Sequence, residues 1–153
     1  MRLIRGLTNL KHIAGSADSP LADGCVATIG NFDGVHRGHK TIIDQVKGKA
    51  RVLNLPSVVM IFEPQPQEFF KGAEAPPRLM PFRQKFEALL GEGVDVVLCI
   101  RFDETFRNYS GMGFIEDVLI NGLGVRHLVV GDDFRFGCDR AGDFKLLQSV
   151  GQE

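Results

Sequence analysis

Residues 30–41 contain two histidines at a spacing that suits phosphate chemistry. The segment reads Gly30-Asn31-Phe32-Asp33-Gly34-Val35-His36-Arg37-Gly38-His39-Lys40-Thr41. Two imidazoles three residues apart at a helix start can point to the same side and donate hydrogen bonds to phosphate oxygens. Glycine lets the backbone approach a ligand, and free amides at a helix start attract anions. The segment therefore predicts a phosphate site, with Gly38 leaving room for a base or ribose.

Two familiar phosphate motifs fail in this segment. A P-loop would need glycine where His39 stands, and a dinucleotide fingerprint would need glycine where Phe32 stands. An isolated histidine pair is more often a turn cap beside a solvated ring, but the surrounding strand, glycines and helix favour function here. A metal site is disfavoured, because Asp33 and Asp44 are the nearby carboxylates and no third histidine or cysteine is close.

Two further segments carry weaker signals. In residues 131–137 the carboxylates of Asp132 and Asp133 could hold a ribose or a hydrated Mg²⁺, and the phenylalanines could flank a flat ring. An acidic turn before two core aromatics explains them equally well. The run Phe62-Glu63-Pro64-Gln65-Pro66 leaves its strand as a stiff edge that could wall a pocket, although a strand stop is the plainer interpretation.

The pattern of apolar residues predicts the elements that position these segments. Short apolar runs predict strands, and apolar residues at helical spacing predict the helices between them. A doubly wound parallel sheet with helices on both faces, an α/β fold, follows from this alternation. Ligands of such sheets bind beyond the strand C-termini, where all three segments lie. The predicted strands are 26–29, 58–62, 94–100 and 127–130, and the predicted helices 37–49, 82–90, 114–123 and 144–150.

Residues 64–81 contain five of the chain's seven prolines. This stretch is too long and too broken for a plain connector, so it predicts a lid or a binding loop. Arg78, Arg83 and Lys85 could reach a phosphate from this region, but solvated surface is the safer expectation for all three. His12 and His127 lie outside the loops and are expected to be structural.

Length and composition limit the classes of protein to which this chain can belong. The chain has 153 residues, 44% of them hydrophobic, and a net charge of −1, as expected for one domain that does not bind nucleic acid. The longest apolar runs span five residues, so no membrane span is expected. The N-terminus has no secretory h-region, and the three scattered cysteines form neither a disulfide framework nor a zinc motif. We expect a cytoplasmic protein.

Three motifs in order resemble the N-terminal FMN adenylyltransferase module of bacterial bifunctional riboflavin kinase/FAD synthetases. They are Gly30-x-Phe32-Asp33-Gly34-Val35-His36-x-Gly38-His39, Phe62-x-Pro64-x-Pro66 and Val130-Gly131-Asp132-Asp133-Phe134-x-Phe136-Gly137. The resemblance extends through Pro77-Arg78-Leu79 and Leu123-Gly124-Val125 to the last residues. His-x-Gly-His alone indicates only the wider nucleotidyltransferase superfamily, which includes class I aminoacyl-tRNA synthetases.

The resemblance implies a Rossmann-like adenylyltransferase that joins the AMP part of ATP to FMN, with Mg²⁺, giving FAD and pyrophosphate. It implies ATP and FMN as partners and leaves the oligomeric state open. It assigns no metal ligand. The implied roles are catalytic for His36 and His39, ATP-binding for Gly30, Phe32, Asp33, Gly38 and Asp133, and flavin-binding for Phe62, Pro64, Pro66 and Phe134.

The sequence departs from the family pattern in three places. Gln65 stands where many relatives have histidine. The family's later Ile-Ser-Ser-Thr-x-x-Arg-like segment and the riboflavin kinase domain with its Pro-Thr-Ala-Asn motif have no counterpart in residues 1–153. We therefore expect a single, truncated adenylyltransferase domain. Two alternatives remain: another His-x-Gly-His nucleotidyltransferase, acting on a nicotinamide nucleotide, phosphopantetheine or glycerol phosphate, or a catalytically silent module that binds flavin or nucleotide.

Overall fold

Five parallel strands form one sheet in the order β1-β4-β3-β2-β5. The computed structural model describes residues 2–131, 134–137, 140 and 142–151. The strands are β1 (Arg2–Arg5), β2 (Cys25–Ile29), β3 (Ser57–Phe62), β4 (Val96–Ile100) and β5 (Val125–Val129). The helices are α1 (Gly6–Ala14), α2 (Arg37–Leu53), α3 (Pro66–Lys71), η1 (Gly72–Glu74), α4 (Phe82–Gly91), α5 (Glu104–Arg107), α6 (Gly111–Phe114), the π-helix η2 (Ile115–Leu123) and α7 (Phe144–Gly151).

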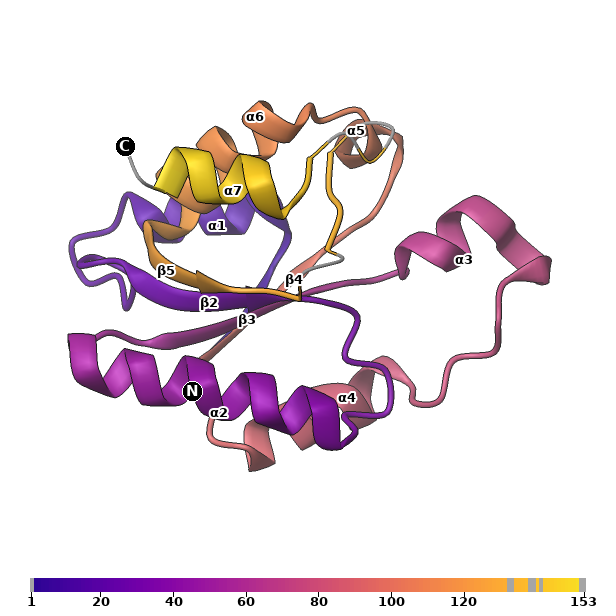
Figure 1. The fold of residues 1–153 in the computed structure, drawn as a ribbon, viewed down its shortest axis with the longest axis horizontal. Coiled ribbons are helices and arrows are strands. Elements are labelled where there is room, and N and C mark those ends of the chain that lie inside the picture. The colour runs from indigo at the N-terminus through magenta and orange to yellow at the C-terminus, as the bar shows by residue number, and fades with distance from the viewer. Residues whose placement is uncertain (1, 132–133, 138–139, 141, 152–153) are drawn as a thin grey trace.

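Helices cover both faces of the sheet, which confirms the predicted doubly wound α/β fold. Helices α1, α6 and α7 lie on one face, and α2 and α4 lie on the other (Figure 1). Alternate residues of β3 enter the two layers: Val58 and Met60 pack under α1 and η2, and Val59 and Ile61 pack against α2 and α4. Because both faces are covered, every residue of β3 is buried.

The structure corrects several predicted boundaries. The strand predicted at 94–100 begins at Val96, and the one predicted at 127–130 is β5, from Val125 to Val129. Strand β5 is an edge strand, and its Arg126 and His127 are exposed. Elements β1, α1, α3, η1 and α5 were not predicted, and α6 begins before the helix predicted at 114–123. None of the described helices combines the length and apolarity needed to cross a membrane.

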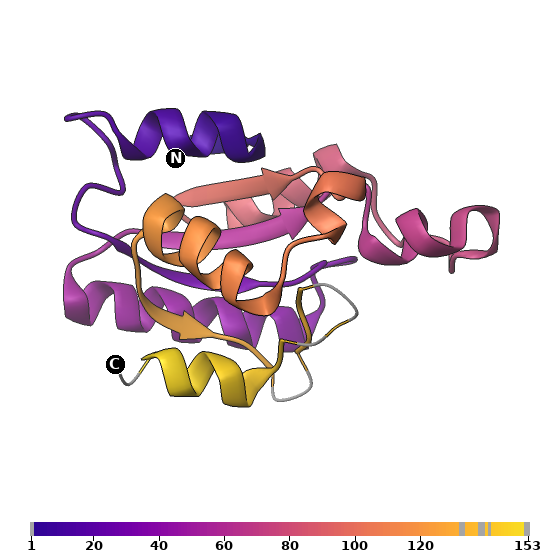
Figure 2. The ribbon, with the colours of Figure 1, turned by 90° about the horizontal axis from the view of Figure 1, so that it is seen from above.

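The strand order identifies where a ligand would enter. Strand β2 lies between β3 and β5 in the sheet. The chain passes from β2 through α2 to β3, and it reaches β5 later, from β4 through α5, α6 and η2. The loops that follow β2 and β5 therefore lead away from each other at the carboxyl end of the sheet. The histidine segment is the first of these loops. Residues 64–81 contain α3 and η1, and α3 projects away from the body at the same end (Figures 1 and 2).

Candidate functional site

The loop between β2 and α2 has an unusual backbone. Phe32, Gly34 and Val35 have φ angles of 51°, 82° and 43°, in the left-handed region that favours glycine. The side chains of Phe32 and Val35 are nonetheless buried, in the cluster that joins the sheet to α2 and α4. Packing of these two side chains therefore holds the loop in a shape that its backbone alone would not prefer.

The two histidines of the loop stack on each other at the start of α2. Their ring centroids are 3.6 Å apart, with 20° between the planes. The His36 Nδ1 accepts a hydrogen bond from the Gly38 N–H at 3.1 Å, and the His39 Nδ1 accepts one from the His36 N–H at 3.2 Å. A neutral imidazole that accepts at Nδ1 carries its proton on Nε2. Each ring therefore keeps an Nε2–H donor for a ligand.

The surroundings of His39 favour the neutral ring. Burial lowers the pKa of His39 to about 4, and the charges of His36 and Lys85 act in the same direction, while Asp33 opposes them. Gly38 keeps the stack together, since a β-carbon there would lie 3.1 Å from His36 Cε1. In this structure the His36 imidazole lies in the space beside Gly38 that was predicted for a base or ribose.

Asp33 connects this loop to residues 75–81. Its carboxylate accepts hydrogen bonds from the backbone N–H of Leu79 at 2.8 Å and of Met80 at 3.0 Å. A β-carbon at Gly34 would lie 3.0 Å from Leu79 Cδ1, so the two segments are in close contact. We call residues 75–81 the strap. The ATP contact predicted for Asp33 stays a prediction; the carboxylate already has two protein partners.

Arg78 anchors the strap to the end of β3 and to α3. Its Nη1 and Nη2 donate to the two oxygens of Glu63 at 3.2 and 2.8 Å, and its Nε donates to Glu68 Oε2 at 3.1 Å. The hydrogen bond from Arg78 lowers the pKa of Glu68. The expectation that Arg78 is solvated surface was therefore wrong, because two carboxylates from neighbouring elements enclose its guanidinium.

Lys85 was also wrongly expected on the surface. Its side chain is 0% exposed, although it extends from the first turn of α4. The sequence contained a signal for this burial: residue 85 lies three positions after Phe82 and four before Leu89, on the apolar stripe of the helix. Arg83 is 89% exposed and pairs with Glu87 at 3.3 Å, as a solvated residue should.

Two of the predicted flavin residues, Phe62 and Phe134, belong to a cluster of aromatic rings. Phe62 is only 8% exposed and meets Phe102 edge-on, with centroids 5.9 Å apart. Pro64 is exposed beyond β3, and Pro66 occupies the first turn of α3. Phe134 stacks on Phe136 at 5.6 Å. The aromatic residues of this cluster that sequence reasoning missed are Phe69, Phe70, Phe102, Phe106 and Tyr109.

The remaining predicted ATP residues give less information. Gly30 lies against Phe32, because a β-carbon on it would approach the Phe32 ring to 3.0 Å. Asp133 lies outside the described residues, so its predicted contact stays a prediction. Among residues 2–131, 134–137, 140 and 142–151, no group of three or more His, Cys, Asp or Glu side chains is placed to hold a metal ion.

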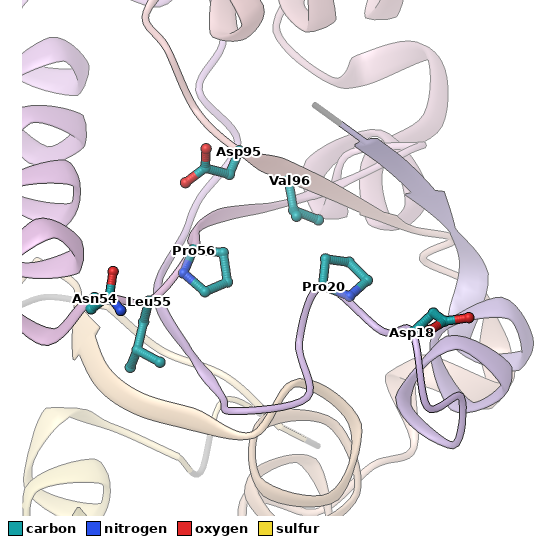
Figure 3. A pocket seen from close by; sticks show the side chains of 7 residues that line it. All are labelled: Asp18, Pro20, Asn54, Leu55, Pro56, Asp95 and Val96. Carbon is teal, nitrogen blue, oxygen red and sulfur yellow. The ribbon is translucent and has the colours of Figure 1, made fainter.

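A pocket of about 580 Å³ opens at the opposite, amino end of the strands (Figure 3). Its lining includes Pro20, Pro56 and Asp95. Asp95 Oδ2 accepts from the N–H and the hydroxyl of Ser57, at 2.9 and 3.0 Å, so this carboxylate holds the start of β3 in place. The pocket lies far along the strands from the histidine loop, and sites in open parallel sheets form at the carboxyl end. We therefore place the candidate site at the histidine loop.

Comparisons with known proteins agree on one family. A family model described as FAD synthetase matches residues 18–153. The bifunctional riboflavin kinase/FMN adenylyltransferase of Pseudomonas fluorescens is 54% identical over 99% of this chain and 46% of its own length, and that of Escherichia coli K12 is 50% identical over 100% and 47%. The chain thus spans about half the length of these relatives.

Solved structures share the fold at low sequence identity. A macrolide-efflux protein from Streptococcus pneumoniae superposes with a TM-score of 0.73 at 24% identity, covering 96% of this chain and 46% of that one. A pantoate-beta-alanine ligase from Francisella tularensis, solved with a β,γ-ATP compound and β-alanine, gives a TM-score of 0.53 at 13% identity, covering 88% of this chain and 68% of that one. At these identities the likeness concerns the fold alone.

Proposed function

The chain belongs to the FAD synthetase family, and we propose that it transfers the AMP part of ATP to FMN, giving FAD and pyrophosphate. In this reaction an oxygen of the FMN phosphate attacks the α-phosphorus of ATP. The bond from that phosphorus to the bridging oxygen of the β-phosphate breaks, and pyrophosphate leaves with the electron pair. The FMN phosphate is already a nucleophile, so the protein has to align the reactants and stabilise the growing negative charge.

The stacked histidines are the observation that carries this proposal. With both Nδ1 atoms engaged by backbone N–H groups, both Nε2–H groups are available as donors to phosphate oxygens. The start of α2 adds the positive end of a 17-residue helix to the same place. His39 acts as a neutral donor at pH 7, because its lowered pKa keeps the ring uncharged.

Mg²⁺ enters this reaction as the counter-ion of ATP. The described residues do not fit a magnesium site of their own, since no group of three ligating side chains is placed for one. No step above depends on a protein-bound metal. Riboflavin kinase, the second activity in the relatives' names, is a proposal for the whole protein. We also propose a cytoplasmic location, in keeping with the free thiols of Cys25 and Cys99.

Separation of flavins by chromatography, after incubation of the chain with FMN, ATP and Mg²⁺, tests the proposal. We expect FAD from the unsubstituted chain and from the control His12→Ala, whose ring is exposed on α1. His36→Ala should lower the rate by about 100-fold, the usual cost of losing one positioned donor. Absence of FAD from the unsubstituted chain would refute the proposal. Turnover of nicotinamide mononucleotide instead would point to another branch of the superfamily, and FMN binding without turnover to a silent module.

A further inference from the structure

Lys85 carries a buried charge that the fold does not neutralise. Its side chain is 0% exposed, and its Nζ has no hydrogen-bond partner among the described residues. It belongs to the first turn of α4, where its own N–H donates to the Pro81 carbonyl at 3.0 Å, and the positive end of a helix disfavours a cation there. Burial lowers the pKa of Lys85, and the charge of Arg78 lowers it further. A buried ammonium without a partner is a costly arrangement.

The carboxylates near Lys85 are committed to other groups. Asp33 and Glu63 act on it through their charge, and its own charge acts on Glu68, whose two oxygens both accept from Arg78. Both oxygens of Asp33 accept backbone N–H groups from the strap, and both oxygens of Glu63 accept from the Arg78 guanidinium. The described part of the chain therefore supplies no free acceptor for this ammonium. An anionic ligand can supply that acceptor.

The position of Lys85 points to the reacting end of the molecule. The charged groups that act on it lie in the strap, at the end of β3 and in the β2–α2 loop, namely Arg78, Glu63 and Asp33. Its charge also acts on His39, one of the stacked pair. A second buried donor in this region lacks an acceptor among the described residues: Nε2 of Gln65, which is 6% exposed and follows Glu63 by two positions.

We propose that Lys85 binds a phosphate oxygen of the nucleotide, with a di- or triphosphate group as the anion that its enclosed ammonium lacks. The choice of anion rests on the proposed function, in which the leaving pyrophosphate gathers charge beside the histidine loop. Entry requires the protein around Lys85 to open, because its side chain is fully buried; the strap, which is tied to Asp33 and Glu63, is the segment that we expect to shift. Lys85 is then a phosphate-binding residue that the resemblance did not assign.

The test is a calorimetric titration of inorganic pyrophosphate into the unsubstituted chain and into Lys85→Met. FMN is left out, so no turnover takes place. Methionine keeps most of the unbranched apolar stem of lysine, is one atom shorter and removes the charge. We expect Lys85→Met to melt at the same or a higher temperature, because an unpartnered buried charge is gone. We expect it to bind pyrophosphate about tenfold more weakly, as for the loss of a charge-assisted hydrogen bond. Arg83→Met, exposed two residues away on the same helix, should bind as the unsubstituted chain does.

Several results would overturn the proposal. One is that Lys85→Met binds pyrophosphate as tightly as the unsubstituted chain does. Another is that the unsubstituted chain does not bind pyrophosphate. A third is that Lys85→Met loses as much affinity for FMN as for pyrophosphate. If Lys85→Met does not fold, Lys85→Gln decides, and failure of both to fold would assign Lys85 to the core. Binding that depends on Lys85 supports the inference even if no FAD forms. FAD synthesis with unchanged pyrophosphate affinity in Lys85→Met would keep the proposed function and refute this inference.

Discussion

Acidification should destabilise this protein through His39. The ordinary pKa of histidine, 6.5, applies to the unfolded chain, whereas burial beside His36 and Lys85 lowers the folded value to about 4. The unfolded state therefore binds the proton first as the pH falls, and the free energy of unfolding drops between about pH 7 and pH 4. The contribution is fully present above pH 7 and is lost below the folded pKa.

The size of this effect follows from the two pKa values. A single group with pKa values of 6.5 and about 4 lowers the free energy of unfolding by about 1.8 kcal/mol between pH 7 and pH 5. His39 is only half-buried, and screening by solvent reduces the expected loss to about 1 kcal/mol. Urea unfolding at both pH values, for the unsubstituted chain and for His39→Gln, measures it. The substituted chain should lose about 1 kcal/mol less on acidification.

An internal control comes from the alkaline side. Between pH 7.5 and pH 8.5 the His39 ring is uncharged in both states, so the two chains should show the same pH dependence there. A loss between pH 7 and pH 5 that is equal in the two chains would refute the reasoning. It would mean that folding does not change the affinity of His39 for its proton, and that the stack can hold a charged ring.

Three further predictions concern the same loops. Gly38→Ala should raise the free energy of unfolding by about 0.5 kcal/mol, because alanine has the higher helix propensity. It should also lower kcat/KM for FAD formation about tenfold, because the new β-carbon displaces the His36 ring. Unchanged kinetics would contradict this prediction. Asp33→Ala removes two hydrogen bonds to the strap and should cost about 2 kcal/mol in urea unfolding, and a cost near zero would show that the strap is held elsewhere. Arg78→Met should weaken FMN binding in a fluorescence titration, and Arg78→Lys should restore it only partly, since lysine lacks the planar fork that joins two carboxylates; full rescue by lysine would argue for charge alone.

The secondary structure was predicted best where burial of apolar side chains alone decides which element forms. An apolar run that ends at Gly30 predicted β2, an apolar run that ends before Pro64 predicted β3, and helical spacing predicted α2 and α4. Burial on both sides of the sheet decides these elements. Strand β1 was missed because only Leu3 and Ile4 are apolar in its four residues. Helix α3 was missed because prolines at 64 and 66 favour extended backbone before them, although Pro66 in the first turn and Glu68 at the third position are signals of a helix start.

The site could be predicted in outline but not in its internal contacts. The spacing of His36 and His39 indicated neighbouring rings, but the bonds that fix both Nδ1 atoms depend on local backbone geometry that no pattern encodes. The partners of Asp33 lie 46 and 47 residues away in sequence, so only the fold brings them together. The charge environment of Lys85 likewise combines residues that are far apart in sequence, Asp33, Glu63 and Arg78.

The left-handed backbone of Phe32 and Val35 links the site to the core. A β-branched residue keeps such a conformation only under outside constraint, which here is the packing of both side chains against Ile43 and its neighbours. The buried part of the loop should therefore not open independently of the core. The amide hydrogen of Val35, which donates to the Phe32 carbonyl at 3.2 Å, should exchange with solvent only when the layer of α2 and α4 separates from the sheet. Adaptation of this protein to a colder or warmer habitat would then have to proceed through core residues that never touch a substrate.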